Sequence, residues 1–160
     1  MYFQLYRYKC IINRIVDGDT IDVDIDLGYD IWIKNERVRL IDIDCPEVRT
    51  RDLVEKEFGF IASRRVAELL PEGSIGYLIS EVYGRRGGFG RILGDFVIHD
   101  GVNNKLLTEI LLEERHAVKW DSKNKALMEE NHLNNRSWLI ENEKLTDDEL
   151  QRIRNLISGS

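Results

Sequence analysis

Three segments of the chain combine acidic and basic side chains in a way that suits chemistry on a phosphate ester. They are residues 16–20 (VDGDT), residues 39–47 (RLIDIDCPE) and residues 89–91 (FGR). Two carboxylates can hold a hard cation, a further carboxylate can position a water molecule, and two arginines can bind phosphate oxygens. Charge stabilisation together with water activation is the minimum that phosphodiester hydrolysis requires.

The order and spacing of these segments resemble the staphylococcal nuclease (thermonuclease-like) family. The shared pattern is D-G-D-T, then R-L-x-x-I-D-x-P-E, then an aromatic residue followed by G-R. The resemblance implies a calcium-dependent nuclease that hydrolyses phosphodiester bonds of DNA and RNA. It also implies a preference for single-stranded substrate and products with 3′-phosphate ends.

The resemblance places the Ca²⁺ ligands at Asp19, Asp44 and the backbone carbonyl of Cys45. Calcium accepts a loose shell of oxygen ligands, and a backbone ligand tolerates cysteine where threonine is usual. Asp42 shares the strand parity of Asp44 and is the nearest alternative ligand. Taken alone, Asp19 would be an ordinary turn residue, and Asp17 more simply shapes the same turn.

By the same resemblance, Arg39, Glu47 and Arg91 are the catalytic residues. Each guanidinium can bind two phosphate oxygens and offset charge that builds in the transition state. Glu47 would orient or deprotonate the attacking water. Arg37 lies on the same strand face as Arg39 and competes for its role, but Arg39 is the residue that directly precedes Leu40 in the motif.

Further contacts with substrate are expected near the third segment. Arg85 and Arg86 can attract a nucleic-acid strand, although a solvated hairpin tip explains them equally well. Tyr83, Lys119 and Trp120 are candidates for contact with a base.

The composition predicts one domain with a short appendage. The chain has 160 residues, a mass of 18.7 kDa and a net charge of −6. Residues 1–142 are expected to form the catalytic domain and residues 143–160 a helical extension. Because nucleic-acid binding usually draws on positive surface, the acidic charge favours an alternative function, a non-catalytic nucleic-acid or protein-binding module on the same fold.

The hydrophobic pattern predicts a mixed α+β fold. Five strands are expected, over residues 6–16, 21–27, 31–44 with a polar corner at residues 34–36, 75–83 and 89–98, the last two forming a hairpin. Helices are expected over residues 55–70, from a cap at Asn103 or Asn104 to residue 115, and over residues 122–140. The strand-and-helix order suits a five-stranded OB-type β-barrel with three packed helices and an additional C-terminal helix. Core positions of the third helix are predicted at Leu127, Leu133, Trp138 and Leu139.

The tail contains a strong helix-start signal. Thr146 and Glu149 are spaced as a capping box, and an apolar stripe from Leu150 to Ile157 follows. A helix this short needs a docking surface, which we expect on its own domain. The alternatives are a second subunit, giving a homodimer through this helix, or another partner.

One geometric demand follows from the motif. Arg39 and Asp44 are five positions apart, so a flat strand would direct them to opposite faces. For both to reach one phosphate, the strand must bulge or bend, and we expect this between Ile43 and Pro46.

The remaining side chains exclude several other classes of protein. Cys10 and Cys45 are expected to be free thiols, and His99, His116 and His132 show no zinc-ligand spacing. The first residues carry no basic segment followed by an apolar run, which predicts a cytoplasmic, intracellular protein. No apolar run is long enough to span a membrane.

Overall fold

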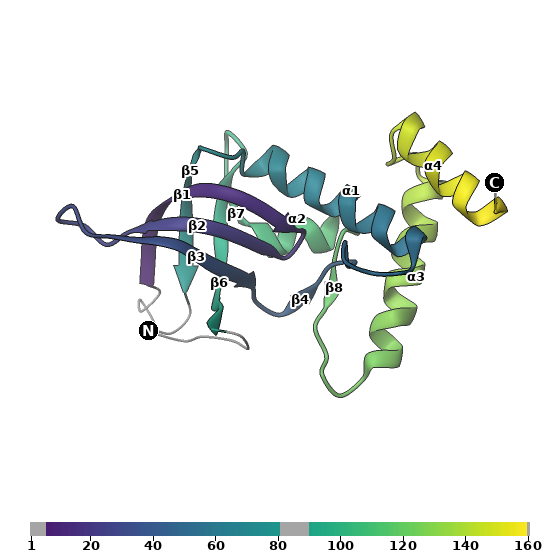
Figure 1. Cartoon of the computed structure of the whole chain (residues 1–160), viewed down its shortest axis with the longest axis horizontal. Coiled ribbons are helices and arrows are strands. Elements are labelled where there is room, and N and C mark those ends of the chain that lie inside the picture. Colours follow the sequence, from purple (N-terminus) through teal and green to yellow (C-terminus); the bar gives the residue numbers. More distant parts are fainter. Residues whose placement is uncertain (1–5, 81–89, 160) are drawn as a thin grey trace.

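The computed structural model describes residues 6–80 and 90–159 and shows a closed five-stranded β-barrel flanked by four helices (Figure 1). The barrel strands are β1 (Tyr6–Asp17), β2 (Thr20–Asp26), β3 (Trp32–Leu40), β5 (Ile75–Ser80) and β6 (Ile92–His99). Their order is β3-β2-β1-β5-β6, and a parallel pairing between β6 and β3 closes the barrel. The predicted OB-type fold is confirmed.

Strict alternation in β2 fixes which of its faces enters the barrel. Ile21, Val23 and Ile25 are buried, while Asp22 and Asp24 point outward and pair with basic residues of β3. Since side chains alternate across a strand, a one-residue slip would place every one of these carboxylates in the core. The alternation therefore sets the register that brings Thr20 opposite Arg39.

Helix α1 (Leu53–Leu69) covers one end of the barrel and begins at an Asp52 N-cap, whose side chain accepts hydrogen bonds from the backbone N–H groups of Val54 and Glu55. Its core face is buried at Phe58, Ile61, Ala62 and Val66. The strand β7 (Asn104–Leu106) pairs with β6 and leads into α2 (Leu107–Glu113). The predicted start of α2 at an asparagine cap is therefore wrong, because residues 104–106 extend the sheet and Leu106 is the N-cap.

A short antiparallel ribbon joins the barrel to helix α3 (Lys125–Glu141). It consists of β4 (Ile43–Asp44) and β8 (Val118–Lys119). Helix α3 packs through Met128, Asn135 and Leu139, which are buried. The predicted core positions Leu127 and Leu133 are wrong, since both are exposed. The buried set follows one helical face, and the two exposed leucines lie off it.

Helix α4 (Asp147–Ser158) starts with the predicted capping box of Thr146 and Glu149 and packs on α1. Ile153 is fully buried there, and the Glu149 carboxylate accepts a hydrogen bond from the Arg64 guanidinium at 2.7 Å. Ile157 remains exposed. None of the helices within the described ranges is long and apolar enough to cross a membrane.

Candidate active site

The turn between β1 and β2 presents Asp19 at the end of the barrel. The Asp19 side chain is buried, and its carboxylate accepts hydrogen bonds from the Thr20 hydroxyl at 3.0 Å and from the Cys45 backbone N–H at 2.9 Å. Gly18 is required in this turn, because a Cβ there would lie 2.9 Å from both the Ala62 Cβ and the Cys45 Sγ. The tight turn thus fixes Asp19 against the β4 segment.

Arg39, near the end of β3, joins Asp19 to Asp44. Its guanidinium lies 3.2 Å from an Asp19 oxygen and 3.4 Å from an Asp44 oxygen. The chain bends between the two motif residues as predicted, but the predicted position of the bend is wrong. It lies at residues 41–42, where Asp42 has a left-handed φ of 57°, and β4 begins only at Ile43. Asp42 is exposed in this turn and does not line the cleft that contains Asp19 and Arg39.

Asp44 has a second partner that the sequence motifs do not include. The His132 Nε2 of α3 lies 2.9 Å from the other Asp44 oxygen. The two residues are 88 positions apart, and no local pattern in the sequence marks His132. The β4–β8 ribbon brings α3 to the site and places this histidine beside the carboxylate.

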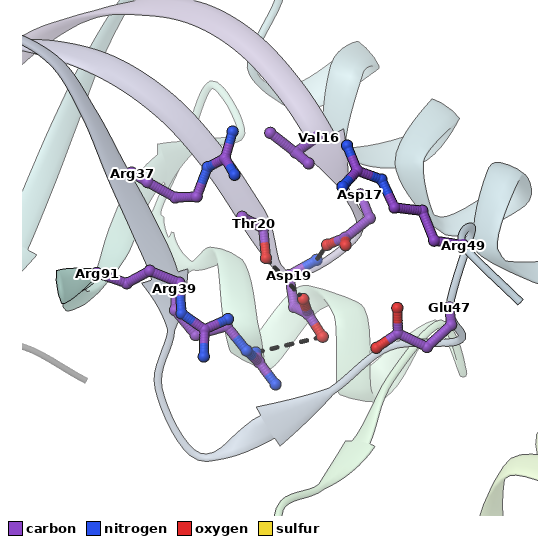
Figure 2. A pocket seen from close by; sticks show the side chains of 9 residues that line it. All are labelled: Val16, Asp17, Asp19, Thr20, Arg37, Arg39, Glu47, Arg49 and Arg91. Carbon is purple, nitrogen blue, oxygen red and sulfur yellow. Dashed lines mark hydrogen bonds and ion pairs between the residues drawn. The ribbon is translucent and has the colours of Figure 1, made fainter. Parts of the chain in front are cut away.

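The predicted catalytic residues share one cleft of about 310 Å³. Figure 2 shows Arg39 and Arg91 on one side of Asp19, with Glu47 on the opposite side. Arg49 also lines the cleft beside Glu47, a contribution that the motifs did not indicate. Arg37 reaches the rim but forms a two-point ion pair with Asp22 at 2.8 and 2.9 Å, so it is not the equivalent of Arg39.

Helix α1 sets the position of Glu47. At Gly59 the helix passes so close to the preceding loop that a Cβ would lie 2.8 Å from the Glu47 carbonyl oxygen and 2.9 Å from that of Pro46. A glycine in the middle of a helix is otherwise unfavourable. Its place here is explained by the close contact, which holds the Glu47 backbone at the edge of the cleft.

The cleft lining mixes charges, with three carboxylates, of Asp17, Asp19 and Glu47, and four arginines, Arg37, Arg39, Arg49 and Arg91. The pKa of Asp19 is raised to about 8, chiefly by burial, with the Arg39 charge opposing the rise and Asp17 adding to it. Burial, followed by the charges of Asp17 and Asp44, raises the pKa of the Glu47 carboxyl. Burial likewise raises the pKa of the Cys45 thiol far above its usual range. An added cation would therefore be stabilised here.

The candidate donors fit a hard cation by their chemistry. The Asp19 and Asp44 carboxylates and the Cys45 carbonyl offer only oxygen, which calcium prefers. Both carboxylates already converge on one cationic group, Arg39. Within residues 6–80 and 90–159, no three His, Cys, Asp or Glu side chains form a metal-binding group, so a metal site rests on this donor chemistry alone.

Two other predictions concern the state of the cysteines and the substrate contacts near the third motif. Cys10 and Cys45 are free and buried, as expected. Tyr83, Arg85 and Arg86 lie outside the described residues.

Comparison with known proteins identifies the family. The family model for staphylococcal nuclease homologues matches residues 37–150. This region contains Arg39, Asp44, Glu47 and Arg91, whereas Asp19 precedes it. No curated protein matches the chain significantly. Because the match covers most of the chain and agrees with the barrel and the cleft, the protein belongs to the staphylococcal nuclease homologue family.

Proposed function

We propose that this protein is a calcium-dependent nuclease that hydrolyses phosphodiester bonds of DNA and RNA and leaves 3′-phosphate ends. Membership of the family indicates a nuclease or a nucleic-acid-binding role. The observation that favours catalysis is the single cleft that gathers Asp19, Arg39, Glu47 and Arg91 from separate segments. A binding module has no need for a carboxylate opposite two arginines.

The two arginines suit the binding of a phosphate in the cleft. Arg39 donates from Nη1 to the Leu40 carbonyl and contacts two carboxylates, while its Nε–H has no hydrogen-bond partner in the described residues. Arg91 lines the same cleft from the start of the β6 segment. Donors fixed before the reaction stabilise the negative charge that develops on phosphate oxygens.

Glu47 is the residue proposed to act on the attacking water. Its carboxylate lies across the cleft from the arginines in Figure 2, and its raised pKa makes it a better base than an ordinary glutamate. The phosphate between Glu47 and the arginines would then be attacked on one side while its leaving oxygen departs on the other.

Asp19, Asp44 and the Cys45 carbonyl are the groups proposed to hold calcium. Calcium, when bound, would supply positive charge that offsets the charge of the reacting phosphate. Support comes from the raised pKa of Asp19, since a buried carboxylate of this kind gains from a cation beside it. Single-stranded substrate is proposed because a flexible strand can bend to bring one phosphate into the cleft more readily than a stiff duplex.

The test is cleavage of labelled single-stranded and double-stranded DNA and RNA, with calcium or with a chelator. We expect calcium-dependent cleavage, faster on single strands, with 3′-phosphate products. Products that end in 5′-phosphate would reject the assignment. Glu47→Gln keeps the shape of the side chain and removes the base. We expect its cleavage rate to fall by a factor of about 10² to 10⁴.

A calcium titration by calorimetry separates the proposal from the alternative module. Wild-type protein should bind calcium, and Asp19→Asn should bind it far more weakly. Nucleic-acid binding with neither calcium binding nor cleavage would leave a non-catalytic module on the same barrel.

A further inference from the structure

A second polar hollow lies beside the β4–β8 ribbon and is lined in part by β8. This groove, of about 400 Å³, runs between α3 and the segment from the end of α2 to β8. We call it the α3 groove. Its polar lining consists of Glu113, Arg115, Lys119, Asn131, Asn134 and Asn135. None of these residues lines the catalytic cleft, yet Lys119 is paired across the ribbon with Ile43, the neighbour of Asp44.

Four of the six polar side chains of the α3 groove form no ion pair or hydrogen bond within the described residues, whereas Glu113 is paired with Lys105 at 2.9 Å. In the described part of the chain, Arg115 and Lys119 form no ion pair, and the Asn131 and Asn134 amides form no hydrogen bond. Asn135 differs, since its amide donates to the Ala117 carbonyl at 3.1 Å and so holds α3 against β8. Other cations of this chain, such as Arg37 and Arg65, are paired with carboxylates.

Helix stability does not explain the two unpartnered asparagines. Asparagine is a poor helix former, because its side chain competes for backbone hydrogen bonds. Asn131 and Asn134 lie in the interior of α3, away from the Asn124 cap, and share one face with Asn135. Their side chains offer both donors and acceptors to whatever enters the groove.

A further cationic side chain, Arg136, lies beside this face of α3, with its guanidinium over the Phe58 ring at 5.6 Å. Arg115 and Asn135 also line a small adjoining hollow, which contains Arg136 and His132. The Arg136 Nε is buried and has no hydrogen-bond partner among the described residues. Arg115 itself stacks on the Trp138 ring at 5.4 Å, which holds its guanidinium at the junction of the two hollows.

We propose that the α3 groove binds a segment of single-stranded nucleic acid that extends beyond the catalytic cleft. Lys119 and Arg115 would contact its phosphates, and Asn131 and Asn134 would bind base edges, which also present donors and acceptors. An acidic peptide would satisfy the cations but offers its carboxylates only as acceptors. The inference rests on the proposed function, because the strand is taken to be the substrate.

The test measures binding apart from cleavage. Fluorescence anisotropy follows labelled DNA and RNA oligonucleotides of about 12 nucleotides, within the range that one OB fold occupies. Every protein carries Glu47→Gln to prevent cleavage. The groove variants are Lys119→Gln and the double variant Asn131→Ala/Asn134→Ala. The control is Lys125→Gln, which changes an exposed lysine of α3 outside the groove. Alanine favours helix, so α3 should be retained, and circular dichroism checks this.

We expect each groove variant to bind the long oligonucleotides about fivefold to tenfold more weakly than the Lys125→Gln protein. Lys119→Gln should also reduce the slope of log affinity against log salt by about 0.7, the value for one phosphate contact on a single strand. Without the Glu47 change, cleavage of a dinucleotide should be the same in the Asn131→Ala/Asn134→Ala and Lys125→Gln proteins. Affinity and slope equal to those of Lys125→Gln would overturn the inference.

Failure of the proposed function gives a different result. If wild-type protein cleaves no substrate with calcium but the groove variants bind oligonucleotides more weakly, the nuclease assignment fails while the groove stands as a nucleic-acid site. If cleavage is normal and the groove variants bind normally, only the groove inference fails. A labelled polyglutamate peptide that binds the groove in place of either oligonucleotide would also overturn it.

Discussion

Gly59→Ala tests whether helix α1 positions Glu47, the carboxylate proposed to activate water. Gly59 lies in the middle of α1, where alanine would normally stabilise the helix by about 0.8–1 kcal/mol. Here the new Cβ would lie 2.8 Å from the Glu47 carbonyl oxygen, and this neighbour is backbone rather than a flexible side chain. Helix propensity and steric contact therefore act in opposite directions.

The size of the effect follows from the contact distance. Ordinary contact begins near 3.4 Å, so the Glu47 backbone must retreat by about 0.6 Å, the difference between 3.4 and 2.8 Å. A displacement of about 1 Å at a reacting group can cost 100-fold, so we expect a fall in kcat of about tenfold, or about 1.4 kcal/mol. Overpacking costs about 1–3 kcal/mol, which the helix gain partly offsets, so stability should fall by about 0–2 kcal/mol.

The assay compares cleavage rates at saturating oligonucleotide with urea unfolding of the same proteins. Ser63→Ala is the matched control, because Ser63 lies one turn further along α1 and bonds only to the Gly59 carbonyl. That variant should keep its kcat. If Gly59→Ala folds and cleaves as fast as Ser63→Ala, the close contact does not position Glu47 and the reasoning is wrong.

Three further perturbations test other parts of the structure. Ile153→Ala should lower the free energy of unfolding in urea by about 2–4 kcal/mol, because Ile153 is fully buried between α4 and α1. A decrease below about 0.5 kcal/mol would mean that α4 is not docked. His132→Ala should weaken calcium binding about tenfold by calorimetry, since His132 orients Asp44, and unchanged affinity would make that contact incidental. Burial raises the pKa of Asp95 above its unfolded value of 3.8, so its contribution to stability is present below that value and is lost as pH rises through the folded pKa. The free energy of unfolding of Asp95→Asn should therefore decrease less than that of wild type as pH rises above about 4. The same dependence on pH in both proteins would contradict this role of Asp95.

The sequence predicted those features that depend on neighbours along the chain. The alternation of β2 predicts which side chains are buried, and the Thr146–Glu149 capping box predicts the start of α4. Both are local, so propensity and pattern suffice. The three motifs predicted a shared cleft only through the family resemblance, because nothing local to Asp19 or Arg91 indicates the other.

The features that the sequence did not predict depend on contacts between distant elements. His132 is an ordinary helix residue until the β4–β8 ribbon brings α3 to Asp44. The bend after Arg39 was placed too late because Asp42 accepts a left-handed conformation that carries no clear sequence signal. The prediction for the third helix is right at Leu139 but wrong at Leu127 and Leu133, because the packing face includes Asn135, a polar residue that donates to the Ala117 carbonyl.

The charges of the two hollows predict different responses to calcium. The catalytic cleft opposes its arginines with the carboxylates of Asp17, Asp19 and Glu47, so a polyanion meets little net attraction until a cation is added. In the α3 groove, Lys119 and Arg115 face a single carboxylate, that of Glu113.

Calcium should therefore strengthen binding of a dinucleotide, which occupies the cleft, by about tenfold or more. With Glu47→Gln protein in chelator, a long oligonucleotide should still bind, and Lys119→Gln should remove most of that residual affinity. Residual binding that is insensitive to Lys119→Gln would show that the strand is held elsewhere.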